Sequence, residues 1–256
     1  MADRRIIAIA NQKGGVGKTT TAINLGAALA ELGQRVTIID LDPQGNASTG
    51  LGIDAANRDP NSYDLLTADA EWGAARRATL IENLSIVPAT SDLASAELDI
   101  AQRPRRTQLL ADALKDADGT VLIDCPPALG LLTINAMVAA DSVIVPLQAE
   151  FYALEGLSQL MLTIREVRAS ANPRLRIEGV LLTMSDARNN LSQQVEADAR
   201  ETLGPLVFQT VVPRNVRVSE SPSHALPVIH YDPASKGSAA YRALAQELAQ
   251  KGAAHG

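Results

Sequence analysis

The chain has 256 residues, of which 46% are hydrophobic and 20% are charged, and its formal net charge is −6. This length and composition suffice for one large α/β domain and exclude the disordered and fibrous classes of protein. The acidic net charge argues against a protein coated with basic residues for gripping nucleic acid, although arginines outnumber acidic residues between Arg165 and Arg217.

Short apolar runs alternate along the chain with segments of helical spacing. The predicted strands are Ile6–Ala10, Val36–Asp40, Leu84–Pro88, Val121–Asp124, Val143–Pro146, Ile177–Thr183 and Leu206–Val211. The predicted helices are Thr19–Leu32, Arg106–Lys115, Leu131–Ala139, Leu154–Ala169, Asn190–Leu203 and Ser238–Gln250. Near-continuous apolar strands that alternate with helices are typical of a mostly parallel sheet with helices on both faces. The sequence therefore predicts a single doubly wound α/β domain over residues 1–256, with ligands bound beyond the carboxyl ends of the strands.

The first predicted strand and helix enclose the glycine-rich segment NQKGGVGKTTT, from Asn11 to Thr21. Its second part matches the phosphate-binding pattern G-x-x-x-x-G-K-[ST], except that Gln12 stands where the pattern has its first glycine. Glycines let backbone N–H groups turn toward an anion, and the start of the helix adds its positive dipole end. Lys18 can then reach the outer phosphates, and the Thr19 hydroxyl can join the shell of a Mg²⁺ ion. A glycine turn without a ligand is the alternative, but strand, loop and helix occur in the required order.

Three aspartates follow predicted strands: Asp40 and Asp42 in TIIDLDPQGN, and Asp124 in TVLIDCPP. Asp124 is predicted to face the Mg²⁺ ion through water. Asp42 lies in a polar loop and is better placed than Asp40 to contact the γ-phosphate or its attacking water. Any one of them alone could instead cap a turn or helix, so which of Asp40 and Asp42 is the main hydrolytic carboxylate stays open. The segment that follows, Gly45–Asn61, is polar and is predicted to be a mobile surface loop.

The single cysteine, Cys125, excludes a disulfide framework within the chain and is typical of a reducing cytoplasm. No apolar run approaches the roughly 18 residues of a membrane span. The carboxyl-terminal helix has few basic residues and an alanine-rich apolar face, which indicates packing rather than membrane anchoring. We therefore expect a cytoplasmic protein with no membrane partner.

The motifs together resemble the ParA/Soj family of deviant Walker ATPases, which partition chromosomes and plasmids. The phosphate loop alone names only a wider class that includes MinD and the nitrogenase iron protein, and later segments narrow the resemblance. Beyond KGGVGKTT, DLDPQGN and LIDCPP, these segments are Pro146–Leu157, Leu181–Arg188, Pro213–Val228 and Tyr231–Tyr241. The resemblance covers essentially the whole chain.

The resemblance implies a dimer in which two subunits sandwich two ATP molecules. Lys13 would reach the nucleotide of the partner subunit, and Gly14 and Gly15 would lie at that close contact. The implied catalytic residues are Lys13, Lys18 and Asp42. The implied nucleotide-binding residues are Lys13, Gly14, Gly15, Val16, Gly17, Lys18, Thr19, Thr20, Pro213 and Asn215, of which the last two would hold the adenine. Thr19 and Asp124 would serve the Mg²⁺ ion.

Arg188 and Arg217 match positions that contact non-specific double-stranded DNA in this family, as a composite surface on the dimer. The alternative for each is an exposed, solvated arginine. The implied function is an ATP-dependent partitioning ATPase of the nucleoid, released from DNA when a ParB-like centromere-binding protein stimulates hydrolysis. Two other functions remain open. One is positioning of another cargo, such as a protein cluster or a polysaccharide machinery, and the other is metabolic phosphoryl transfer on the same fold.

Overall fold

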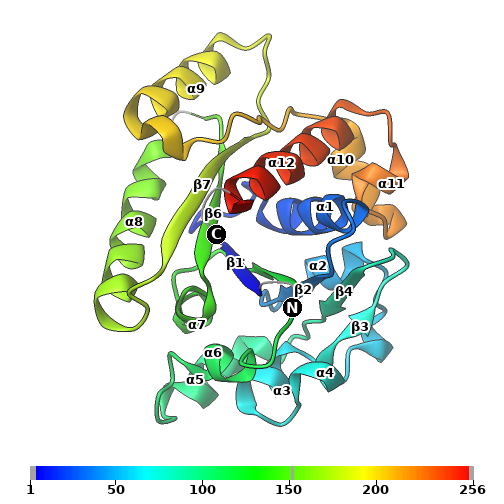
Figure 1. Cartoon of the computed structure of the whole chain (residues 1–256), viewed down its shortest axis with the longest axis vertical. Helices are drawn as coiled ribbons and strands as arrows, with labels where there is room; N and C mark the ends of the chain where they lie inside the picture. Colours follow the sequence, from blue (N-terminus) through cyan, green and yellow to red (C-terminus); the bar gives the residue numbers. More distant parts are fainter. Residues whose placement is uncertain (1–3, 151–152, 254–256) are drawn as a thin grey trace.

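The computed structural model describes residues 4–150 and 153–253, and this part of the chain forms one seven-stranded sheet flanked by helices (Figure 1). Phe151 and Tyr152, which belong to one of the resembling segments, lie outside the described residues. The strands are β1 (Arg5–Ile9), β2 (Val36–Asp40), β3 (Arg77–Ala78), β4 (Leu84–Val87), β5 (Thr120–Asp124), β6 (Ser142–Gln148) and β7 (Arg176–Thr183). Their order in the sheet is β3-β4-β2-β5-β1-β6-β7, and every neighbouring pair is parallel except β3 with β4. The predicted fold class, a mostly parallel doubly wound sheet, is confirmed.

Helices cover both faces of this sheet because both faces of its strands are apolar. In β1, Ile6 and Ala8 pack into one hydrophobic cluster, and Ile7 and Ile9 pack into the other. Figure 1 shows α1 and α12 side by side against one face, with α7 and α8 on the other. A strand with apolar residues at every position is stable only when both of its faces are buried.

The helices with predicted counterparts are α1 (Lys18–Glu31), α6 (Leu109–Ala113), α7 (Leu131–Ala139), α8 (Ala153–Ser170), α9 (Asn190–Leu203) and α12 (Lys236–Ala253). Six further helices of the described residues were not predicted: α2 (Asn46–Gly50), α3 (Ser62–Thr67), α4 (Trp72–Ala75), α5 (Leu93–Ala101), α10 (Val216–Glu220) and α11 (Val228–Tyr231). Five of these span at most two turns, too short for periodicity to be visible. None of the helices in the described part of the chain is long and apolar enough to span a bilayer.

The predicted strand Leu206–Val211 is wrong. This segment begins in a 3-10 turn, Gly204–Leu206, and then runs beside the edge strand β7. Within the segment, only the backbone N–H of Phe208 reaches β7, at the Val180 carbonyl (3.0 Å); the next such bond, from Val212 to Leu182 at 2.9 Å, follows the segment. Between these two hydrogen bonds the chain advances by four residues, from Phe208 to Val212, whereas β7 advances by only two, from Val180 to Leu182. This mismatch prevents a continuous ladder of backbone hydrogen bonds. The apolar character of the segment is explained by the burial of Phe208, whose ring packs against Gly179.

Register places the phosphate loop and the two strand-end aspartates at one edge of the sheet. Asp124 at the end of β5 pairs with Ile9 at the end of β1 and with Asp40 at the end of β2. The loop between β1 and α1 leaves the sheet at this edge. In an open parallel sheet this is where ligands bind.

Candidate functional site

The loop from Ala10 to Gly17 has the geometry of an anion-binding cradle. Gly15 and Gly17 have φ values of 74° and 88°, a left-handed backbone that side chains other than glycine rarely adopt. Gly17 is the N-cap of α1, so it supplies no side chain to cap the first helical N–H groups, and the first turn has no acidic residue. These N–H groups therefore stay available for a phosphate at the positive end of a 14-residue helix.

Two neighbouring strands tie the loop in place. The amide of Asn11 donates to the carbonyl of Pro146 in β6 at 2.7 Å, and its Oδ1 accepts the backbone N–H of Lys13 at 3.0 Å. At the other end of the loop, the hydroxyl of Thr183 in β7 donates to the carbonyl of Val16 at 2.9 Å. The cradle is therefore held in shape by the sheet itself, which preorganises it for binding.

Lys18 folds back over the loop that precedes it. Its Nζ donates to the carbonyl of Lys13 at 2.9 Å, and only 7% of the residue is exposed. Burial lowers the pKa of Lys18, while the negative charge of Asp124 opposes that shift. The ammonium group is thus a buried cation directed at the inside of the cradle, where it can hold a phosphate.

Asp124 is a fully buried carboxylate, and neither of its oxygens makes a hydrogen bond of good geometry with the described residues. Burial and the nearby carboxylate of Asp40 raise its pKa well above the usual value, and the neighbouring Thr19 hydroxyl favours the charged form. A buried acid without a partner is unfavourable unless a cation or water completes its surroundings. The donor set of one carboxylate beside one threonine hydroxyl fits Mg²⁺, which prefers oxygen ligands and keeps water and phosphate in its shell.

The structure separates the roles open to Asp40 and Asp42. Asp40 is fully buried and accepts three hydrogen bonds, from the Asp42 N–H at 3.2 Å and from the N–H and hydroxyl of Ser48 at 2.9 and 2.7 Å. Burial nevertheless raises the pKa of Asp40 to about 6. Asp42 lies beyond the strand and is 9% exposed, and among the described residues its carboxylate accepts only the Gln44 N–H, at 3.0 Å. Asp42 therefore has acceptor capacity left for a ligand, and Asp40 has little.

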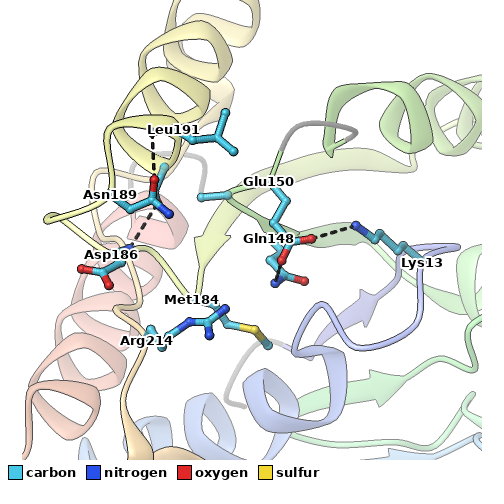
Figure 2. Close-up of a pocket in the computed structure, with 10 residues that line it drawn as sticks. Lys13, Gln148, Glu150, Met184, Asp186, Asn189, Leu191 and Arg214 are labelled. Carbon is cyan, nitrogen blue, oxygen red and sulfur yellow. Dashed lines mark hydrogen bonds and ion pairs between the residues drawn. The ribbon is translucent and has the colours of Figure 1, made fainter.

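Lys13 points away from the cradle, to the rim of a cavity of about 470 Å³ (Figure 2). Its Nζ forms an ion pair with Glu150 at 3.4 Å, in which the two side chains are 43% and 48% exposed. Glu150 also accepts a hydrogen bond from the side-chain amide of Gln148. The sequence analysis did not single out Glu150, because nothing in the chain order relates it to Lys13.

A second cavity, of about 320 Å³, lies beside α1 and has the size and mixed polarity of a small-ligand pocket. Pro213 and Asn215 line it together with Met184 at the end of β7 and the buried Tyr241 of α12. Asn215 also caps α10, since its Oδ1 accepts the Arg217 N–H at 2.8 Å, and its amide N–H₂ has no hydrogen-bond partner among the described residues. The two predicted residues are thus brought to one pocket. Met184 and Tyr241 lie in segments that carried the family resemblance, but the sequence analysis assigned neither of them a role.

Arg214 lines both cavities, and Figure 2 shows it next to Met184. Its guanidinium makes no hydrogen bond or ion pair with any residue that the structure describes. The sequence analysis assigned Arg214 no role. The structure places this positive charge between the two cavities, where it adds to the lowering of the Asp186 pKa that is caused mainly by Arg188.

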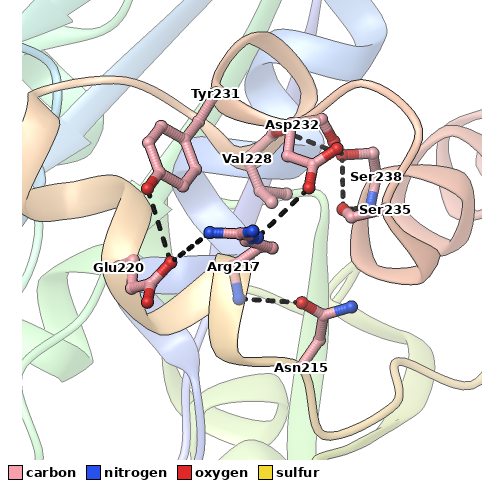
Figure 3. A network of polar contacts seen from close by, with 8 residues as sticks. All are labelled: Asn215, Arg217, Glu220, Val228, Tyr231, Asp232, Ser235 and Ser238. Carbon is pink, nitrogen blue, oxygen red and sulfur yellow. Dashed lines mark hydrogen bonds and ion pairs between the residues drawn. The ribbon is translucent and has the colours of Figure 1, made fainter.

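The two arginines predicted to contact DNA are exposed, but each is bound to acids of its own chain. Arg188 precedes α9, is 92% exposed in its side chain and pairs with Asp186 at 3.2 Å. Arg217, in α10, lies between Glu220 at 3.0 Å and Asp232 at 3.3 Å (Figure 3). A polyanion at either arginine would have to compete with these carboxylates.

The chain is similar to known proteins over nearly its whole length. The AAA domain family matches residues 4–177. Chromosome partitioning protein ParA of Caulobacter vibrioides is 56% identical over 249 residues, which cover 95% of this chain and 93% of that protein. Sporulation initiation inhibitor protein Soj of Bacillus subtilis is 53% identical, over 97% of this chain and 99% of that protein. A solved structure of cobyrinic acid a,c-diamide synthase from Mycobacterium smegmatis, with a bound ATP analogue and magnesium, is 40% identical. It superimposes with a TM-score of 0.83, over 95% of this chain and 93% of that one.

Proposed function

The chain belongs to the ParA/Soj family of chromosome-partitioning ATPases, and on that premise we propose that it partitions DNA through an ATP-dependent dimer. Residues 1–256 act as one ATPase domain that binds ATP and Mg²⁺. Two copies sandwich two ATP molecules, and the dimer binds non-specific double-stranded DNA of the nucleoid. The observation that carries the proposal is the opposite orientation of two lysines on one loop, with Lys18 turned into the cradle and Lys13 turned out to its rim.

The phosphates of ATP bind in the cradle. The backbone N–H groups from Gly14 to Thr20 surround them, and Lys18 moves its Nζ from the Lys13 carbonyl to the outer phosphates. The base occupies the cavity of Pro213 and Asn215. The support for this placement is that the cavity opens at Gly17 and Thr20, beside the start of α1.

Thr19 and Asp124 hold the Mg²⁺ ion, and the buried, unpartnered carboxylate of Asp124 supports this assignment. When bound, Mg²⁺ neutralises negative charge on the phosphates. Asp42 orients the water that attacks the γ-phosphate, since Asp124 is assigned to Mg²⁺ and, of the two aspartates after β2, Asp42 has the freer carboxylate. Lys18 stabilises the negative charge that develops on the transferred group.

Lys13 serves the nucleotide of the partner subunit. Its pair with Glu150 is half exposed, and exposed ion pairs of this kind contribute about 0.2–1 kcal/mol, so exchange for a phosphate is easy. Gly14 and Gly15 allow the two loops to approach each other without side chains between them. A lysine supplied in trans acts as an arginine finger does, by adding positive charge at the transition state.

DNA binds to Arg188 and Arg217 of both subunits. Because each arginine is paired with acids in one chain, a single subunit holds DNA weakly, and a dimer that doubles the contacts gains avidity. ATP then controls DNA binding by creating the two-fold surface. A ParB-like centromere-binding protein stimulates hydrolysis and so releases the dimer from DNA.

The experiment that tests the proposal is co-sedimentation with non-specific double-stranded DNA in ATP, in ADP and without nucleotide. Binding that is promoted by ATP alone is expected. Equal binding in all three conditions would contradict the proposal.

Two other functions predict different results. A positioning ATPase for another cargo would share the ATP dependence but ignore a ParB-like partner encoded beside it. A metabolic enzyme, which the name of the 40% identical structure makes a specific alternative, would turn over ATP with a small-molecule acceptor and show no dependence on DNA.

A further inference from the structure

The segment after Asp42, predicted to be a mobile polar loop, is instead tied down by the side chain of Arg58. All three types of guanidinium nitrogen donate to this region: Nε to the Ile53 carbonyl at 3.1 Å, Nη1 to the Ala89 carbonyl at 3.1 Å and Nη2 to the Thr49 hydroxyl at 2.8 Å. Every acceptor is uncharged, and Arg58 forms no ion pair with the described residues. One side chain therefore joins the α2 segment, through Thr49 and Ile53, to Ala89 after β4.

Arg58 also lies directly on the turn that contains Asp42. Gly45 has φ 63°, which favours glycine, and Arg58 Nη1 lies where a Cβ atom of this residue would be. The turn is closed by the Gly45 N–H, which donates to the Asp42 carbonyl at 2.9 Å. The Thr49 hydroxyl, which Arg58 holds, donates to the Gly45 carbonyl at 3.1 Å. The guanidinium thus covers the far end of the turn whose first residue is Asp42.

Asp40 and Ser48 hold the same segment from the inside. The Ser48 hydroxyl donates to Asp40 and accepts the Ala89 N–H at 2.9 Å, while the Ala89 carbonyl accepts from Arg58. Ala89 follows β4, next to β2 in the sheet. Both polar groups of one residue at the sheet edge are therefore used to fix the α2 segment, with Asp40 and Ser48 on one side and Arg58 on the other.

We propose that Arg58 is a positioning residue for ATP hydrolysis, which holds the Asp42 turn in the geometry that orients the attacking water. The inference rests on the proposed role of Asp42. Arg58 lines neither cavity of the nucleotide site, so it acts only through the turn. Its loss loosens Asp42 and leaves the contacts to the phosphates and base unchanged.

Arg58→Met keeps an unbranched apolar stem as far as the position of Nε and removes every donor. Steady-state ATP hydrolysis without DNA is expected to show kcat reduced by a factor between about ten and about a hundred, with KM for ATP unchanged, since a misplacement of about 1 Å can lower a rate about a hundredfold. Guanidinium ion added to Arg58→Ala, well below concentrations that unfold the wild type, should restore part of kcat. Hydrogen exchange should rise in residues 42–49 of Arg58→Met.

Arg200→Met is the matched control. Arg200, on α9, likewise makes several hydrogen bonds, to Glu196 and to the carbonyls of Phe208 and Gln209. The Arg200→Met variant should leave kcat unchanged. Wild-type kcat in Arg58→Met, or an equal loss in Arg200→Met, would overturn the inference. Asp42→Ala separates this result from the proposed function. If Asp42→Ala still hydrolyses ATP, the proposed role of Asp42 itself is refuted. If Asp42→Ala is inactive and Arg58→Met is fully active, only the positioning role of Arg58 is refuted.

Discussion

Lys13→Ala provides the sharpest test of the ATP-sandwich dimer, because the two lysines of the loop should fail in different ways. Lys18 binds within its own subunit, whereas Lys13 is expected to act on the partner's nucleotide. Lys13→Ala should therefore leave ATP binding to the monomer intact. Its hydrolysis should fall below roughly 1% of the wild-type rate, because charge supplied in trans to a phosphoryl transition state contributes factors of this order or more.

The magnitudes in the free chain support this reasoning. The pair between Lys13 and Glu150 spans 3.4 Å with both side chains about half exposed, and such pairs contribute about 0.5 kcal/mol. A hydrogen bond from an ammonium to a phosphate in a water-excluded interface contributes about 1.5–3 kcal/mol. The contact in trans is thus the stronger one. Glu150→Gln should accordingly change ATP-dependent dimerisation by only about twofold.

Mixing two inactive variants provides the assay. Lys13→Ala retains Asp42, and Asp42→Ala retains Lys13, so each mixed dimer has one site with both groups if Lys13 acts in trans. An equimolar mixture should then recover roughly a quarter of the wild-type rate, since half of the dimers are mixed and each has one working site of two. If Lys13 served its own subunit, no site in the mixture would be complete. A mixture as inactive as its components would therefore refute the reasoning.

Three further outcomes follow from the site. Lys18→Ala should weaken ATP binding about a hundredfold or more by removing a charge-assisted phosphate contact, as measured by titration with a fluorescent ATP analogue, and tight binding would contradict the assignment. Arg188→Ala combined with Arg217→Ala should abolish DNA co-sedimentation at moderate salt while ATP-dependent dimers persist in size-exclusion chromatography. Burial raises the pKa of Asp40 to about 6 and that of Asp124 well above its usual value, so the unfolded chain loses these protons first. The free protein should therefore lose stability as the pH rises from about 4 through about 6, and Asp124→Asn should flatten this slope in urea titrations.

Much of the fold could be predicted because its buried strands are short, nearly continuous runs of apolar residues. Six of the seven predicted strands and all six predicted helices occur in the structure, with Leu131–Ala139 and Asn190–Leu203 at their predicted bounds. The wrong strand, Leu206–Val211, is apolar for another reason, the burial of Phe208 against Gly179. A short apolar run is compatible with either outcome, and only its partner decides between them.

The amino-acid sequence by itself determined the α/β class, the phosphate loop with its two lysines, and the three aspartates at the strand ends. These features are local: glycine backbone freedom, helix polarity and strand periodicity all act over a few neighbouring residues. Only the tertiary structure decided that Asp40 accepts two hydrogen bonds from Ser48 and that Lys13 forms an ion pair with Glu150. The same is true of the three hydrogen bonds by which Arg58 contacts the region of the Asp42 turn. Glu150 is far from Lys13 in sequence, and Ala89 is far from Arg58, so strand order and register, not spacing along the chain, bring these groups within hydrogen-bonding distance.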